Sequence, residues 1–105
     1  MKQFIVIAHD AKDEGAYERR LATRDAHVAA MSKLRTQGSI LIGVAIKNDA
    51  DKMVGSVMVM NFPSRTELDA WLKTEPYVKA NVWGEVTVMN GALGPSFSDL
   101  LKKAE

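Results

Sequence analysis

Three residues whose side chains bind anions or move protons lie on one line of a predicted helix. The segment TRDAHVAAM (23–31) belongs to an apolar–polar pattern that predicts a helix over about residues 15–37. Arg24 projects into the middle of the apolar stripe, and Arg20 and His27 lie within it at the spacing i, i+4, i+7. The apolar members of the stripe are Tyr17, Leu21, Val28, Met31 and Leu34. Because burying an unpaired charge is unfavourable, we expect an anionic group, either a protein carboxylate or a ligand, to face Arg24.

A carboxylate on a second predicted helix is the candidate partner. The apolar face of this helix, predicted over 64–75, consists of Leu68, Trp71 and Leu72. Glu75 continues that line, so it approaches Arg24 or His27 if both helices cover one face of a sheet. A histidine oriented by a carboxylate is the arrangement that general acid–base catalysis uses. His27 and Glu75 are therefore the candidate catalytic residues, and Arg24 is a candidate for binding substrate. The alternative is a structural pair between Arg24 and Glu75, with His27 half in water.

Two further polar residues are candidates for binding a substrate. Ser56 starts a predicted strand and either lines a pocket or is a strand-edge hydroxyl without a function. Tyr77 either closes a pocket with its hydroxyl or packs as a loop anchor. His9 and Asp10 end the first predicted strand, where capping of the following loop is the expected role. No metal site is predicted, because His9 and His27 are the only histidines and no ligand spacing is present.

The overall composition narrows the class of protein. Lys and Arg number 14 and Asp and Glu 13, so no broad basic surface for nucleic acid is expected. The sequence has no cysteine, which excludes disulfides and cysteine nucleophiles. The N-terminal segment lacks the apolar core and cleavage site of a signal peptide, and no apolar run reaches the length of a membrane span. These features predict a cytoplasmic globular protein that binds neither nucleic acid nor a membrane.

The expected elements follow the order strand, helix, strand, strand, helix, strand. Strands are predicted over 3–9, 39–47, 55–62 and 82–90, and helices over 15–37 and 64–75. Asp13 is the expected N-cap of the first helix and Gly38 its C′ residue. Ser64 and Glu67 form a capping box for the second helix. The order predicts an α+β, ferredoxin-like β-α-β-β-α-β fold with an antiparallel sheet.

The predicted strands are apolar on both faces. In the first predicted strand, Phe4, Val6 and Ala8 alternate with Ile5 and Ile7. In the second, Ile40, Ile42 and Val44 alternate with Leu41 and Ala45. In the third, Met58, Met60 and Phe62 alternate with Val57 and Val59. The helices cover only one face, and a monomer would leave an unusually large apolar patch on the other. We therefore expect a face-to-face homodimer of one domain over residues 1–90. Residues 91–105 form a C-terminal tail, with a short helix expected over 96–103.

The chain resembles the YciI-like family, a branch of the dimeric α+β barrel superfamily. The matching segments are RLATRDAH (20–27), QGSILIGV (37–44), GSVMVM (55–60) and TEPYVKANVW (74–83). The resemblance covers residues 1 to about 90. It implies a dimeric α+β barrel with a pocket between helices and sheet, and a His–Asp dyad as the polar centre of that pocket. Arg24 and His27 match the family's Arg-x-x-His motif, and Glu75 stands where the family usually has aspartate.

The same resemblance implies a lyase or isomerase that uses no cofactor and acts on a small cyclic, hydroxylated or anionic compound. On this interpretation His27 moves a proton, Glu75 orients or polarises the imidazole of His27, and Arg24 either holds an anionic group or pairs with Glu75. One alternative is a small-molecule-binding or accessory protein without catalysis, which a turnover screen distinguishes. Another is a cofactor-free monooxygenase, as in other dimeric α+β barrels, which oxygen dependence distinguishes.

Overall fold

Four antiparallel strands form one sheet in the computed structural model, which describes residues 1–101. The strands are β1 (Lys2–Asp10), β2 (Ile40–Lys47), β3 (Met53–Phe62) and β4 (Trp83–Gly91). Their order in the sheet is β2-β3-β1-β4, with the first and third strands of the sequence in the centre. This arrangement confirms the predicted α+β, ferredoxin-like fold.

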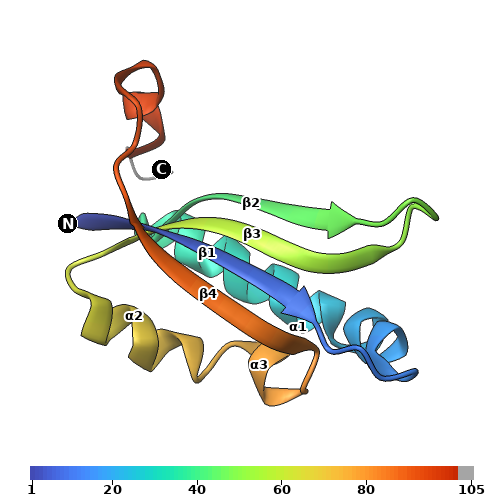
Figure 1. Ribbon diagram of the computed structural model, residues 1–105. Helices are drawn as coiled ribbons and strands as arrows, with labels where there is room; N and C mark the ends of the chain where they lie inside the picture. The colour runs from blue at the N-terminus through green and yellow to red at the C-terminus, as the bar shows by residue number, and fades with distance from the viewer. Residues whose placement is uncertain (102–105) are drawn as a thin grey trace.

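Three α-helices cover one face of the sheet (Figure 1). They are α1 (Ala16–Gln37), α2 (Arg65–Leu72) and α3 (Pro76–Lys79). The second predicted helix ends before Glu75, as expected, but the separate short helix α3 was not predicted. Glu75 has extended backbone geometry, with ψ 128°, because the following proline disfavours the helical region. Pro76 then begins α3, with Glu75 as its N-cap.

The two ends of α1 differ in how well the sequence predicted them. Gly38 ends the helix in the left-handed conformation, with φ 78°, as predicted. Asp13 is not the N-cap; that position is taken by Gly15, which makes no side-chain cap bond. The carboxylate of Asp13 is instead bound by Arg19, at 2.6 and 2.8 Å, so it cannot turn back to cap the first turn. At α2 the predicted cap holds, since Ser64 Oγ accepts the backbone N–H of Glu67 at 3.3 Å.

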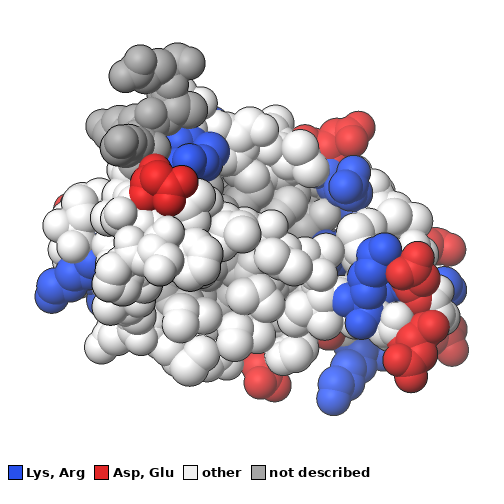
Figure 2. Space-filling model, turned by 90° about the horizontal axis from the view of Figure 1, so that it is seen from above, with Lys and Arg blue, Asp and Glu red and all other residues white. Residues whose placement is uncertain are grey.

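The core lies between the helices and one face of the sheet. It includes the buried side chains Phe4, Val6, Met58, Met60, Leu68 and Tyr77. Within residues 1–101, no helix covers the opposite face. Its central residues Ile5, Ile7, Val57 and Val59 are half-buried, and Ile42, Val44 and Met89 toward its edges are exposed. Figure 2 shows uncharged side chains over much of the molecule seen from above, with many of the charged ones gathered at one end.

A bulge in β2 changes which of its side chains face the helices. Ile40 pairs with Met60, but Ile42 pairs with Val59, so Leu41 is an extra residue in the ladder. Simple alternation had placed Ile40 and Ile42 on the same face. That prediction was wrong, because the extra residue reverses the alternation: Ile40 is buried and Ile42 is 49% exposed.

A short 3-10 segment, η1 (Pro95–Leu101), follows β4 and is kinked at Phe97. It occupies the described part of the predicted C-terminal helix, and Lys102 and Lys103 lie outside the described residues. None of the helices within residues 1–101 combines the length and the apolar character needed to span a membrane.

Candidate functional site

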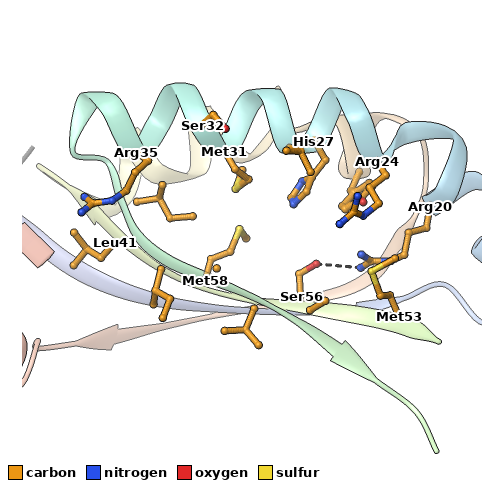
Figure 3. Close-up of a pocket in the computed structure, with 17 residues that line it drawn as sticks. Arg20, Arg24, His27, Met31, Ser32, Arg35, Leu41, Met53, Ser56 and Met58 are labelled. Carbon is orange, nitrogen blue, oxygen red and sulfur yellow. Dashed lines mark hydrogen bonds between the residues drawn. The ribbon is translucent and has the colours of Figure 1, made fainter. Parts of the chain in front are cut away.

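A pocket of about 370 Å³ lies between α1 and the β2–β3 side of the sheet. Figure 3 shows polar and apolar side chains pointing into it from the helix above and the strands below. Its polar lining includes Arg20, Arg24, His27, Ser32, Arg35, Ser56 and Tyr77. Its apolar lining includes Val28, Met31, Ile40, Leu41, Ile42, Val44, Met53 and Met58. Arg20, Arg24 and His27 thus line the pocket from the first half of α1, and apolar side chains form most of the rest of its wall.

His27 and Glu75 lie in direct contact at this site. The distance from His27 Nδ1 to Glu75 Oε1 is 2.7 Å, and to Oε2 it is 3.2 Å. The Glu75 side chain is fully buried, whereas 14% of the His27 side chain is exposed. Glu75 also accepts the backbone N–H of Tyr77 at 3.1 Å, which fixes the carboxylate at the start of α3. The carboxylate is thus in contact with groups from two elements, the imidazole of α1 and the backbone N–H of α3.

Two aromatic rings hold the imidazole from other directions. The Tyr77 ring stacks on His27 with centroids 4.0 Å apart and an interplanar angle of 14°. The Trp83 ring meets His27 edge-on, with centroids 6.0 Å apart. With Nδ1 bound to Glu75 and these rings beside it, the orientation of the imidazole is strongly restricted. No partner for Nε2 of His27 is present among residues 1–101.

The buried arginine of α1 is Arg20, not Arg24. Arg20 is 2% exposed, and its guanidinium forms two hydrogen bonds to the carboxylate of Asp10, at 2.7 and 2.9 Å. Burial opposes its charge, but the hydrogen bonds and charge of Asp10 outweigh burial, so the pKa of Arg20 is raised. Its Cζ also lies 4.6 Å from the centroid of the Tyr77 ring. Asp10 is therefore a partner within the fold and not only a loop residue.

Arg24 lies in the pocket wall but is exposed. The prediction that it is buried in the stripe was wrong, because helical projection gives the direction of a side chain and not its depth. The alternative pairing of Arg24 with Glu75 is also absent, since the carboxylate is engaged by His27 and Tyr77. Within the described part of the chain, Arg24 has no ion-pair partner. Its guanidinium is available to an anion in the pocket.

Ser56 and Tyr77 also line the pocket. Ser56 is 5% exposed, and its Oγ accepts hydrogen bonds from Arg20 Nη2 at 3.0 Å and from Trp83 Nε1 at 3.3 Å. Burial raises the pKa of the Tyr77 hydroxyl, although Arg20 and Arg24 act in the opposite direction. The hydroxyl of Tyr77 consequently stays protonated at neutral pH.

Sequence reasoning missed the part played by Asp10 and Trp83. Asp10 has the same parity as Val6 and Ala8, whose side chains face the helices, and this parity was the available signal. Trp83 gave no comparable signal, because a tryptophan at the start of a strand is most often a core residue. Groups of three or more His, Asp and Glu side chains suited to a metal ion are absent from residues 1–101.

The ferredoxin-like fold and this helix–sheet pocket define an α+β protein with a small-molecule-sized site. Residues 2–91 match the YCII-related domain, and the chain belongs to that family. It is 32% identical to Protein YciI of Escherichia coli O6:H1 over 91 residues, covering 81% of this chain and 91% of that protein. It is 25% identical to an uncharacterised protein of Haemophilus influenzae, and this match also covers 81% of this chain and 91% of that protein.

Solved structures show the same fold. The 5-chloro-2-hydroxyhydroquinone dehydrochlorinase TftG from Burkholderia phenoliruptrix AC1100, in complex with 2,5-dihydroxybenzoquinone, matches with a TM-score of 0.75 and 21% identity. The match covers 90% of this chain and 97% of that chain. A putative antibiotic biosynthesis monooxygenase from Deinococcus radiodurans matches with a TM-score of 0.52 and 10% identity over 90% of this chain and 93% of that chain. At these identities the likeness concerns the fold alone.

Proposed function

We propose that this protein is a cofactor-independent enzyme of lyase or isomerase type that acts on a small, anionic or cyclic metabolite. The observation that carries the proposal is the contact between His27 Nδ1 and the fully buried carboxylate of Glu75, at 2.7 Å, at the wall of a pocket. The dehydrochlorinase activity named for the structural neighbour TftG is also a lyase-type reaction, which supports this class.

The proposed chemistry is the transfer of one proton by His27. In the proposed tautomer, the N–H of Nδ1 donates a hydrogen bond to the Glu75 carboxylate. Nε2 then carries a free lone pair and acts as the base. Nε2 takes a proton from the substrate, and the imidazolium that forms is stabilised by the adjacent carboxylate. The proton then returns at another atom of the substrate in an isomerisation, or a leaving group departs in an elimination. Neither route needs a redox partner.

Arg24 and the apolar wall determine which substrates bind. The guanidinium of Arg24 has no ion pair within residues 1–101, so it is available to hold an anionic group. Met31 and Met58 project into the pocket from opposite walls (Figure 3). Their flexible side chains adapt to the carbon skeleton of a small ligand. Tyr77, stacked on His27, contributes its protonated hydroxyl to the same wall.

The functional unit that we propose is a homodimer that forms a dimeric α+β barrel. No helix of residues 1–101 covers the sheet face formed by Ile5, Ile7, Val57 and Val59, and apolar faces of this kind are normally covered. A second copy of the same sheet covers it with a matching apolar surface. The pocket opens between α1 and the sheet, and Ile42 and Val44 of its lining belong to the edge of this uncovered face.

A turnover screen with matched histidine variants tests the proposal. The substrates are hydroxylated and chlorinated hydroquinones and small lactones, followed by absorbance and mass spectrometry. His27→Gln should lower turnover by roughly 10²-fold or more, because general acid–base catalysis contributes at least that much. Glu75→Gln should lower it less, since an amide still orients the ring, and Glu75→Asp should retain activity. His9→Gln is the control, because His9 is an exposed histidine of β1 outside this pocket.

The same screen distinguishes the alternatives. Ligand binding without turnover, unchanged in His27→Gln, identifies a binding or accessory protein and contradicts the proposal. Turnover that stops when oxygen is removed identifies a monooxygenase, which also contradicts it.

A further inference from the structure

The hydroxyl of Ser56 is held by two hydrogen-bond donors. Nη2 of Arg20 donates to Oγ at 3.0 Å and Nε1 of Trp83 donates at 3.3 Å. Both donors are fixed, since Asp10 binds the guanidinium of Arg20 through two hydrogen bonds and Trp83 is buried. A serine hydroxyl accepts two hydrogen bonds and donates one. Both accepting positions of Ser56 are therefore filled, and only its own hydrogen is left to donate.

The direction of that hydrogen follows from the position of Ser56. Ser56 is nine-tenths buried and lines the pocket, and its oxygen points from β3 toward the helix side (Figure 3). Residues 1–101 offer no acceptor for its hydrogen. The positive charge of Arg20 behind the oxygen draws electrons from the O–H bond, which makes the hydroxyl a stronger donor. The pocket thus contains a buried donor whose acceptor comes from the pocket itself, as water or as a ligand atom that replaces it.

We infer that Ser56 is an oxyanion-binding residue and that the substrates of this site are carbonyl compounds with an acidic C–H bond next to the carbonyl. The inference rests on the proposed function for its base, His27. A prealigned donor in a site shielded from water stabilises charge that develops on oxygen during reaction. A carbonyl oxygen gains such charge when a neighbouring carbon loses a proton.

The step balances without any further reactant. Nε2 of His27 takes the proton, so a C–H bond breaks and an N–H bond forms. The electron pair of that C–H bond becomes the carbon–carbon double bond of an enolate, and the carbonyl π electrons move to the oxygen. Ser56 donates its hydrogen bond to this oxygen, while Arg24 supplies a positive charge on the opposite wall of the pocket. Loss of a leaving group from the next carbon completes an elimination; where a further carbon–carbon double bond is conjugated with the enolate, reprotonation by His27 at the far end of that double bond completes an isomerisation.

Binding of a phenolate tests the inference without knowledge of the natural substrate. The probe is 4-nitrophenol, whose anion is an oxyanion on an sp² carbon and absorbs visible light. The wild-type protein should bind the anion more tightly than the neutral phenol, so the bound probe should ionise at a lower pH than the free probe. Ser56→Ala should weaken binding of the anion by roughly tenfold to hundredfold, the effect of one hydrogen bond to a charged group. Binding of the neutral analogue 4-nitroanisole should stay the same.

A second pair of variants keeps the test decisive if Ser56→Ala unfolds. Ser56→Thr and Ser56→Val have side chains of the same shape, and only threonine keeps the hydroxyl. The threonine variant should keep the preference for the anion, and the valine variant should lose it. Ser39→Ala, a serine outside the pocket, controls for the general effect of the substitution.

Two results overturn the inference. One is equal binding of the phenolate by wild type and Ser56→Ala, or by the threonine and valine variants. The other is a wild-type protein with no preference for the anion over the neutral phenol. These readouts do not depend on turnover, so failure of the proposed proton transfer by His27 is a separate result in the histidine screen.

Discussion

At the scale of single residues, two arginines one helical turn apart have different environments. Arg20 is buried and bound by Asp10, whereas Arg24 is exposed in the pocket wall. The sequence correctly indicates that this line of α1 carries charges toward the body of the protein. It does not show which arginine is buried, because that depends on where the end of β1 places its carboxylate. The alternative role proposed for Arg24, that of a paired core residue, belongs to Arg20.

Asp10→Asn should therefore destabilise the fold strongly. The change leaves the buried guanidinium of Arg20 without its counter-charge, and breaking a buried pair costs about 3–5 kcal/mol. The free energy of unfolding in urea measures the effect. Arg24→Ala is the comparison variant: it should change stability by no more than about 0.5 kcal/mol while weakening the binding of anions. Equal stability of Asp10→Asn and wild type would show that the Arg20–Asp10 contact contributes little.

At the scale of elements, the apolar periodicity was sufficient to predict where the strands and α1 lie. The details that depend on pairing between strands were not predictable from one segment at a time. The extra residue Leu41 in β2 is an example, because a bulge is defined only against its partner strand. The division between α2 and α3 follows from Pro76. In the sequence, Pro76 predicted the end of the preceding helix but not the second helix that begins there. That division places Glu75 at an N-cap, where its carboxylate meets His27.

The stability that the loop before α1 contributes to the fold depends on pH through Asp13. The hydrogen bond from Arg19 is the largest factor that lowers the pKa of Asp13, from 3.8 to about 2. A lowered pKa means that the folded state favours the charged carboxylate, so this contribution is fully present above about pH 4 and is lost as the pH falls toward 2. Asp13→Asn should be slightly less stable than wild type at pH 7. The difference in unfolding free energy should shrink as the pH falls toward 2 and disappear below it, and a difference of unchanged size over that range would contradict this account.

At the scale of the whole molecule, the apolar face opposite the helices leads to the prediction of a homodimer. Light scattering at micromolar protein should give twice the mass of one chain. Val57→Lys should separate the subunits and leave them folded, because Val57 faces away from the helices. Met58→Lys should instead unfold the chain, since Met58 is 1% exposed in the core beneath the helices. A wild-type protein that is a stable monomer contradicts the proposed assembly.

The arrangement of Trp83 gives the site an optical reporter of its own. The indole lies edge-on to His27, with ring centroids 6.0 Å apart, and donates to Ser56. Indole fluorescence is quenched by a neighbouring imidazolium and shifts with the polarity of its surroundings. The chain has only one other tryptophan, Trp71, which packs against Phe62 and is not among the residues that line the pocket. In a Trp71→Phe background, the emission of Trp83 therefore reports the arrival of a ligand beside His27 without any attached dye.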